Sequence, residues 1–530
     1  MHQPGCADAA SAPVDVRLVP AALTCWAVTA AGIRWPVGRV LALCCVGLAA
    51  GAGLLAWRAA RQAGSGARLS AIGAGLVAVG VVGAGFGFAI ALRADAVDRH
   101  PITAAAGTVV VVTVAATESP VAVGPVNQGR LMFRANLKRV RDDEMSGRVV
   151  VFARASDFGG LTVGQPMRFT ARIGRPTRHD LTVAVLTATG RPEAGAASAV
   201  QRAAHRVRGR FAAAVRDALP AEQAAMLPAL VLGDTSAVSA QTRGDFRAAG
   251  MTHLTAVSGA NVTIVCAAVL FSARVIGPRA AVVLAGAALA AFVVVVQPTP
   301  SVLRAAVMGA TALAGILSSR RRQAMPALSA TVLILLAVAP QLAVDVGFAL
   351  SVLATAALVV IAPGWSRRLV RRGCPKPLAD GLAVACAAHV VTAPLVAGIS
   401  GRVSLVAVGA NLAVAPVIAP ITVLGSAAAG LCLLWPACAQ LLIRFTGPEL
   451  WWVLRVARSA AGVPAATVPV PAGVGGVVVV AAVAGGVVLL WRWRWFRAAV
   501  TPVLAVLGMC ALAWTIAERF GTSRGAVGPS

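Results

Sequence analysis

The sequence contains no tyrosine and few charged residues. Charged side chains make up 12% of the 530 residues, whereas soluble domains typically contain about 25%. This difference excludes an ordinary water-soluble enzyme. Extended disorder is also excluded, because it requires high charge and low hydrophobicity, and 58% of this chain is hydrophobic. The mean hydropathy of +0.81 favours a polytopic chain built from membrane spans of about 20 residues each.

Lysine and acidic residues are scarce as well. Lysine occurs only at Lys138 and Lys376. The chain has 19 acidic and 47 basic residues, which gives a net charge of +28. Two explanations stay open: arginine-rich cytoplasmic loops in a compositionally biased chain, or a polyanionic partner. The ten cysteines lie mostly in apolar stretches without zinc-ligand spacing. We therefore expect no metal site and no cofactor, and the absence of G-x(4)-G-K-[ST] excludes a nucleotide-binding P-loop.

Apolar runs dominate both ends of the chain. Three lie at about residues 18–33, 37–57 and 69–92, and about ten more follow between 254 and 516, which predicts about 11–14 spans in a cytoplasmic (inner or plasma) membrane. Arginines in the 58–68 segment indicate a cytoplasmic loop. Residues after 93 then lie outside, provided that the first run is a hairpin or an interfacial segment. Pro416 and Pro420 interrupt a later run and predict a discontinuous helix.

Residues 93–197 have a different character, with short β-branched runs between turn residues. Polar and apolar side chains alternate over 130–138 and 167–173, as in half-buried strands. About five such strands favour a small external barrel with an OB-like fold. Its cations are candidates for guiding DNA from outside: Arg130, Arg134, Lys138, Arg168 and Arg172. A merely solvated sheet face explains the same residues equally well.

An arginine-rich amphipathic stretch, residues 200–219, precedes the most informative segment, residues 229–265. There, ionisable residues crowd the edge of an apolar span. Ser239 is placed to cap a short helix that Gly250 ends. A helix broken near the membrane surface requires protein or water around its backbone, and ionisable groups within membranes indicate function. The candidates for a pore or DNA path are Asp234, Asp245, Arg247, His253, Ser258, Gly259, Asn261, Arg304 and Asn411.

Each candidate also has a structural interpretation. Asp234 and Asp245 fit as helix caps or as partners of arginines, His253 as a hydrogen-bonding residue at a helix end, and Arg304 as a snorkelling side chain. Ser258, Gly259 and Asn261 fit a hydrated path or a phosphate cradle better. A Ser258 nucleophile is disfavoured because G-x-S-x-G is absent, and we assign no catalytic residue.

The stretch LGD–x(11)–FRAAGMTHLTAVSGAN, from Leu232 to Asn261, resembles the signature of the ComEC competence proteins. Further agreement comes from PSVLRAAVM, from GFALSVLAT, and from a TAPL…SL…N…P pattern that includes Ser404 and Asn411. Two features differ from the family. Asn261 stands where the family has histidine, and the six histidines do not form the H-x-H-x-D-H set of the metallo-β-lactamase-like domain that many members carry.

The resemblance implies a channel component that moves single-stranded DNA into the cytoplasm. It also implies an external DNA receptor and a cytoplasmic helicase-like ATPase as partners, besides membrane lipids; homo-oligomerisation stays open. The alternatives are a transporter or flippase of another anionic, lipid-phosphate substrate, and a membrane-embedded hydrolase using Asp234, Asp245 and His253. We expect five regions: an N-terminal part (1–92), the external barrel (93–197), interfacial helices (198–250), a channel core (251–462) and C-terminal helices (463–530).

Overall fold

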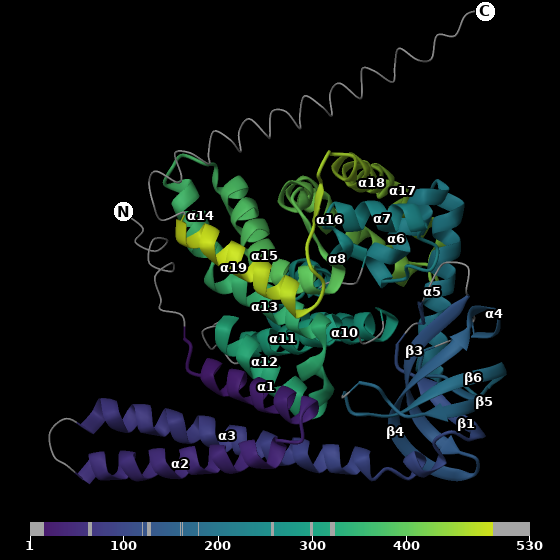
Figure 1. Cartoon of the computed structure of the whole chain (residues 1–530). Coiled ribbons are helices and arrows are strands. Elements are labelled where there is room, and N and C mark those ends of the chain that lie inside the picture. Colours follow the sequence, from purple (N-terminus) through teal and green to yellow (C-terminus); the bar gives the residue numbers. More distant parts are fainter. Residues whose placement is uncertain are drawn as a thin grey trace, which may run out of the picture. The chain divides into compact units, whose positions relative to one another are not determined.

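The computed structural model describes residues 15–490, apart from 62–65, 119, 124–128, 159–160, 162, 179, 256–258, 297–299 and 318–323. Helices predominate, and one β-barrel stands among them (Figure 1). The chain divides into two compact units. One comprises residues 1–206 and 269–349, and the other comprises residues 207–268 and 350–530. Ser258 and the last predicted span, 500–516, lie outside the described residues.

The first unit begins with α1 (Val19–Arg34) and an antiparallel hairpin of α2 (Gly38–Arg61) and α3 (Gly66–Asp98). Three α3 glycines, seven residues apart, lie against α2. A methyl carbon added to each would lie only 2.5–2.9 Å from an alanine Cβ of α2; the pairs are Gly73 with Ala56, Gly80 with Ala49, and Gly87 with Ala42. Small residues at this spacing bring the two backbones together, which is how helices associate within lipid.

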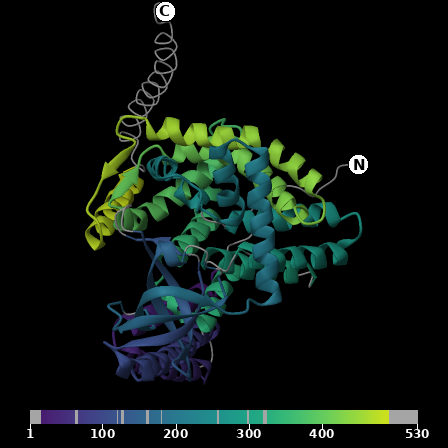
Figure 2. The same ribbon diagram turned by 90° about the vertical axis from the view of Figure 1, so that its right-hand side faces the viewer.

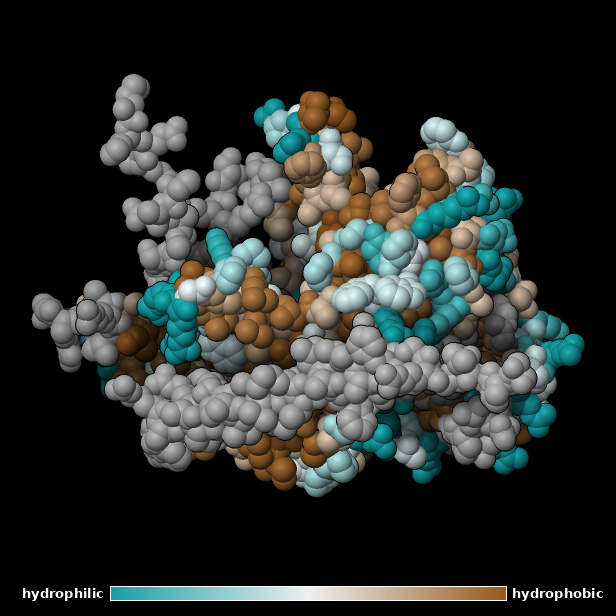
Figure 3. Space-filling view, turned by 90° about the horizontal axis from the view of Figure 1, so that it is seen from above, coloured by the Kyte–Doolittle hydropathy of each residue, from teal (hydrophilic) through white to brown (hydrophobic). Residues whose placement is uncertain are grey.

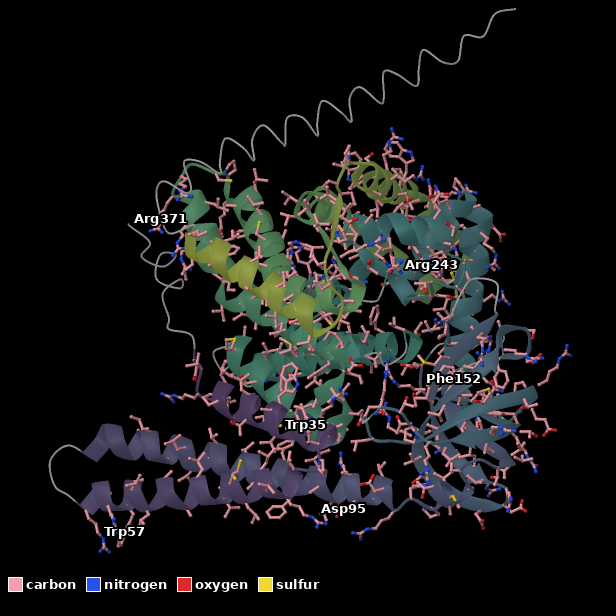
Figure 4. The ribbon with its side chains drawn as sticks, viewed as in Figure 1. Trp35, Trp57, Asp95, Phe152, Arg243 and Arg371 are labelled. Atoms are coloured by element: carbon pink, nitrogen blue, oxygen red, sulfur yellow. The ribbon has the colours of Figure 1, made fainter. Side chains whose placement is uncertain are left out.

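Six described helices are long and apolar enough to cross a membrane, and six shorter apolar helices accompany them. Hydrophobic residues cover much of the surface in Figure 3. Exposed tryptophans mark both ends of α2 (Figure 4): Trp35 just before it, and Trp57 in its last turn, where the Arg61 guanidinium lies 3.8 Å from the ring centroid. Tryptophan and arginine at both ends of an apolar helix are typical of membrane–water interfaces.

The predicted barrel is present as a small closed barrel of five strands with one added short strand (Figure 2). The predicted strands correspond to β1 (Val109–Ala116), β3 (Arg130–Val140), β4 (Asp143–Arg154), β5 (Pro166–Gly174) and β6 (Thr182–Ala194), and β2 (Val121–Ala122) is additional. The order is β1-β5-β6-β4-β3-β2, and β1 also pairs with β3, which closes the barrel. The β4–β6 pair is parallel, and the other pairs are antiparallel.

The barrel interior follows from the alternation of side chains along the strands. Phe133 and Phe169 are buried from β3 and β5, and their neighbours along each strand point outward. Phe158, on the short helix α4 (Ala155–Phe158), packs between them, with its ring centroid 6.1 Å from that of Phe133 and 5.2 Å from that of Phe169. Full burial of each ring contributes about 1.5–3 kcal/mol.

The first unit also contains α10 (Pro278–Val296), α11 (Pro300–Leu317) and α12 (Ala324–Val338). The second unit holds most of the predicted channel core. Its helices are α6 (Ala221–Leu232), α7 (Ala240–Ala248), α8 (Thr252–Thr255), α14 (Ala362–Val370), α15 (Lys376–Ser400), α16 (Ala407–Leu431), α17 (Pro436–Phe445), α18 (Gly447–Ala461) and α19 (Val474–Leu490). Strands β7 (Arg402–Ser404) and β8 (Thr467–Pro469) pair there. Three helices have residues in both units: α5 (Ala199–Ala218), α9 (Gly259–Ala273) and α13 (Val346–Val360).

The expectation of a discontinuous helix at Pro416 and Pro420 is wrong. Helix α16 continues through both prolines. Proline removes a backbone N–H and leaves a carbonyl one turn earlier without its usual partner, but donors from neighbouring helices can compensate within a packed bundle. The Trp452 indole of α18 ties this stretch of α16 to its neighbour, with its Nε1 2.9 Å from the Ala413 carbonyl oxygen, one residue after the Leu412 carbonyl that Pro416 leaves without its usual donor.

Candidate functional site

The signature begins at the end of α6, a helix that is buried from Met226 to Leu232. Gly233 ends it in the left-handed conformation (φ 72°), and the N–H groups of Gly233 and Asp234 donate to carbonyls of the last turn. The Asp234 carboxylate accepts hydrogen bonds from the backbone N–H and the hydroxyl of Ser236, at 3.1 and 2.6 Å. Asp234 therefore stabilises a turn, a structural role that differs from the helix cap and the arginine partner considered for it.

Helix α7 begins as its sequence predicts. The Ser239 hydroxyl accepts a hydrogen bond from the Thr242 backbone N–H at 3.0 Å, the interaction expected of an N-cap. Thr242 and Phe246 form the buried side of α7, whereas Arg243 and Arg247 are exposed (Figure 4 labels Arg243). The short helix is thus held by one cap and one buried face.

Gly250 ends α7 in a turn that fits tightly against α16. Its φ of +68° favours glycine, and an added Cβ would lie 2.4 Å from the Ala407 Cβ. The Ser404 hydroxyl donates to the Ala248 carbonyl oxygen at 2.7 Å. The Asn411 amide donates to the carbonyl oxygens of Ala407 (2.8 Å) and Gly250 (3.4 Å). We call this arrangement of Ala248, Gly250, Ser404, Ala407 and Asn411 the turn clamp.

Asn261 lies in the first turn of α9, next to the end of α6. Its side chain is 5% exposed, and its amide donates to the Leu230 carbonyl oxygen at 2.8 Å. A cavity of about 10 Å³ is lined by Asn261 and Thr422 together with Leu230, Leu254, Ile418 and Ile421. That volume is about what one water molecule requires. Among the described residues, this cavity therefore has room for about one water molecule, with the Asn261 amide and the Thr422 hydroxyl as its polar lining.

A cluster of charges holds α6, α7 and α18 together. Glu222 of α6 accepts hydrogen bonds from the Arg458 guanidinium and from the Thr242 hydroxyl. Asp245 lies nearby and is half-buried. Burial raises the pKa of Asp245; Arg458 opposes this shift, and the negative charge of Glu222 adds to it. The cluster has the character of a structural ion-pair network, and sequence reasoning did not identify Glu222 or Arg458.

The other predicted path residues are not gathered at one point. His253 is exposed on α8, and Gly259 opens α9. Arg304 belongs to the first unit, where its side chain is 7% exposed on α11 and its Nη1 lies 3.3 Å from the Met308 sulfur. No hydrogen bond or ion pair joins Asp234, Asp245 and His253 in the part of the chain that the structure describes, and no group of three His, Cys, Asp or Glu side chains there could hold a metal ion.

The proposed DNA-guiding cations are distributed around the barrel. Arg130 opposes Arg154 across β3 and β4. Arg134 forms an ion pair with Glu118 at 3.3 Å. Lys138 is exposed near the end of β3, and Arg168 and Arg172 are exposed on β5. Arg168 opposes Glu193 of β6, which weakens the positive field there.

A sequence model described as "Competence protein" matches residues 230–495, half of the chain. It begins at the end of α6 and includes the turn clamp. The chain belongs to the ComEC family of competence proteins. No curated protein and no solved structure matches the chain. Family membership, together with six long apolar helices, indicates a multi-pass membrane protein with a role in DNA uptake.

The turn clamp joins two segments of the family signature. FRAAGM and the SL…N pattern are about 150 residues apart in the sequence, and the clamp joins them through Ser404 and Asn411. The resemblance marked both segments, whereas their contact became visible only in three dimensions.

Proposed function

We propose that this ComEC-family protein is a membrane channel component that passes single-stranded DNA into the cytoplasm. The match of the competence family over residues 230–495 carries this proposal. Such a channel requires a hydrated, weakly cationic path, because the strand carries one charge per nucleotide. It also requires sequence-independent contacts that are weak enough to release the strand.

The start of α9, beside the end of α6, is our candidate for the narrowest point of the path. Thr255 ends α8 and Gly259 begins α9, and the adjacent cavity has room for about one water molecule. Passage of a strand therefore requires α9 to move relative to α6 and α16. The Asn261 amide and the Thr422 hydroxyl would then line the opening.

Arg304 is the candidate phosphate contact of the first unit. A guanidinium that is 7% exposed within an apolar helix is costly to keep there, and intramembrane arginines generally serve function. A guanidinium binds phosphate well, because its planar set of N–H donors matches the phosphate oxygens.

We also propose that the barrel is an OB fold outside the cytoplasm. Its five main strands connect in the order of a Greek-key barrel, with β1 joined to both β3 and β5, and OB folds bind oligonucleotides. The arginines in the last turn of α2, Arg58 and Arg61, would lie inside. Because α3 then crosses back, the barrel that follows it would meet incoming DNA from an external receptor. Movement would need a cytoplasmic helicase-like ATPase.

Replacement in a transformable bacterium tests the function. The resident family gene is deleted, this chain is expressed in its place, and entry of labelled DNA into the DNase-resistant fraction is measured. Restored uptake is the expected result. If the chain reaches the membrane and uptake stays at the deletion level, the proposal is wrong.

A matched pair of variants then tests the path. Arg304→Gln should lower uptake, whereas Arg279→Gln, at an exposed position at the start of α10, should not. Scrambling of labelled lipid by the purified protein in vesicles, with no DNA transport, would support the flippase alternative instead.

A further inference from the structure

The outer face of strands β3 and β4 carries a strip of side chains whose order suggests a ligand. Four cross-strand pairs face outward: Asn136 with Arg148, Arg134 with Val150, Met132 with Phe152, and Arg130 with Arg154. Their neighbours Phe133, Val149, Val151 and Ala153 are buried inside the barrel. The strip therefore has an apolar centre, Met132 and Phe152, and arginines toward both ends. We call it the β3–β4 strip.

Phe152 places a large apolar ring on the outer face of the barrel, where polar side chains are more usual. Its ring is half-buried on the outer face (Figure 4), beside Met132 and opposite the exposed Thr187 of β6. Among the described residues no aromatic ring stacks on it, whereas the inward phenylalanines form a cluster. A half-exposed ring with flanking cations is the arrangement on which unpaired bases stack in single-strand-binding proteins.

Arg148, at one end of the strip, provides a separate observation. Its Nη1 is buried and has no hydrogen-bond partner within the described part of the chain. Burial lowers the pKa of Arg148, and the positive charge of Arg134 lowers it further; the negative charges of Asp180, Glu118 and Asp345 oppose this shift. A buried donor without an acceptor costs about 1–3 kcal/mol. An anionic oxygen placed there would remove that cost.

The spacing along β4 suits a nucleotide chain. Arg148 and Phe152 are four residues apart on the same face, which corresponds to about 13 Å, and Arg154 follows after about 7 Å more. A phosphate at Arg148 and another at Arg154 and Arg130 would leave the intervening bases over Phe152 and Met132, while Arg134 keeps its ion pair with Glu118. A duplex cannot present a base face in this way, because its bases are stacked and paired with each other.

We propose that the β3–β4 strip binds single-stranded DNA, with Phe152 as the base-stacking surface and Arg148 as a phosphate contact. This inference rests on the proposed function for the identity of the polymer. The strip then distinguishes single strands from duplexes at the barrel, before any strand enters the membrane-embedded part.

The test uses the full-length protein in lipid nanodiscs and a fluorescein-labelled oligo-dT strand, with anisotropy as the readout. Stacking on an aromatic side chain contributes about 1–3 kcal/mol per base, so Phe152→Leu should weaken binding by about 5- to 150-fold. Phe152→Trp keeps an aromatic ring at this position and should bind the strand as tightly as the parent does. Affinity for a duplex should not change. Val109→Ala, which trims an exposed side chain on β1, is the matched control and should bind as the parent does.

The salt dependence of binding tests the phosphate contact of Arg148. Arg148→Gln should reduce the slope of log affinity against log salt by about 0.7, the amount expected for one phosphate contact on a single strand. Arg175→Gln, an exposed arginine after β5, should leave the slope unchanged. Preserved folding of each variant is checked by its elution volume and its melting temperature.

The outcomes separate this inference from the proposed function. If the parent binds oligo-dT and neither Phe152→Leu nor Arg148→Gln changes binding, the strip is not the site, although DNA uptake can still stand. Equal weakening of single-strand and duplex binding by Phe152→Leu overturns the strand discrimination. If the parent does not bind oligo-dT but restores uptake in cells, the inference fails and the proposed function survives.

Discussion

The turn clamp makes a sharp prediction about Gly250. In Gly250→Ala, the new Cβ would lie 2.4 Å from the Ala407 Cβ and 3.3 Å from the Ser404 Cβ. A residue other than glycine in the left-handed conformation costs about 1–2 kcal/mol, and overpacking of a tight contact costs about 1–3 kcal/mol more. The expected loss in the free energy of unfolding is therefore about 2–5 kcal/mol.

Thermal unfolding of the purified protein in nanodiscs measures this loss. With about 2–4 °C per kcal/mol for a domain of this size, the melting temperature of the second unit should fall by about 4–20 °C. DNA uptake should fall with it. The matched control is Gly244→Ala, six residues earlier in α7, where no atom lies within 4 Å of the added Cβ. That change should stabilise the helix by about 0.5–1 kcal/mol. Equal melting temperatures for Gly250→Ala and the parent would refute the clamp as described.

Three further predictions concern other parts of the molecule. Asn261→Leu should lower the free energy of unfolding by about 1–3 kcal/mol, because the Leu230 carbonyl loses its donor; chemical denaturation measures this. Asp245→Asn should stabilise the protein at pH 7 by about a few tenths of a kcal/mol, since burial raises the pKa of this carboxyl and water screens much of the effect. Gly80→Val should destabilise the α2–α3 hairpin by about 1–3 kcal/mol through overpacking, whereas Gly75→Val, in open space, should be tolerated; thermal unfolding compares the two.

A raised pKa means that ionisation of Asp245 costs more in the folded protein, so the gain from Asp245→Asn should vanish as the pH falls below the ordinary aspartate pKa of about 3.9. A gain that persists at pH 3 would contradict this explanation. For Asn261→Leu, unchanged stability would mean that the Leu230 carbonyl finds another donor. For the hairpin, equal effects of the two valine variants would show that the glycine–alanine spacing is unimportant.

The barrel strands could be predicted from the sequence because the inside and outside of a small barrel differ strongly. Phe133 and Phe169 alternate with charged neighbours, and a period of two residues follows directly from strand geometry. The closure through β1 and β3 could not be predicted in the same way. It depends on pairing between residues such as Val112 and Val140, which are distant in sequence and carry no local signal of their partner.

The candidate site was predicted less completely, for reasons visible in individual residues. Ser239 and Gly250 act locally, so cap and turn preferences identified them. Asn411 carries an amide that suits a hydrated pore equally well, and only the position of the Gly250 carbonyl shows what that amide binds. Pro416 and Pro420 suggested a broken helix because the sequence does not show that α16 packs against α18, where the Trp452 indole donates a hydrogen bond to the Ala413 carbonyl oxygen.

The glycine–alanine spacing of the α2–α3 hairpin has a consequence for biogenesis. A seven-residue repeat keeps one seam in register along two slightly supercoiled helices, and close backbone contact, unlike burial of leucine, does not weaken when lipid replaces water as the surroundings. Helices α2 and α3 can therefore pack against each other as soon as both have entered the bilayer, before the rest of the polypeptide has been synthesised. The hairpin would then serve as a preassembled anchor for the later segments.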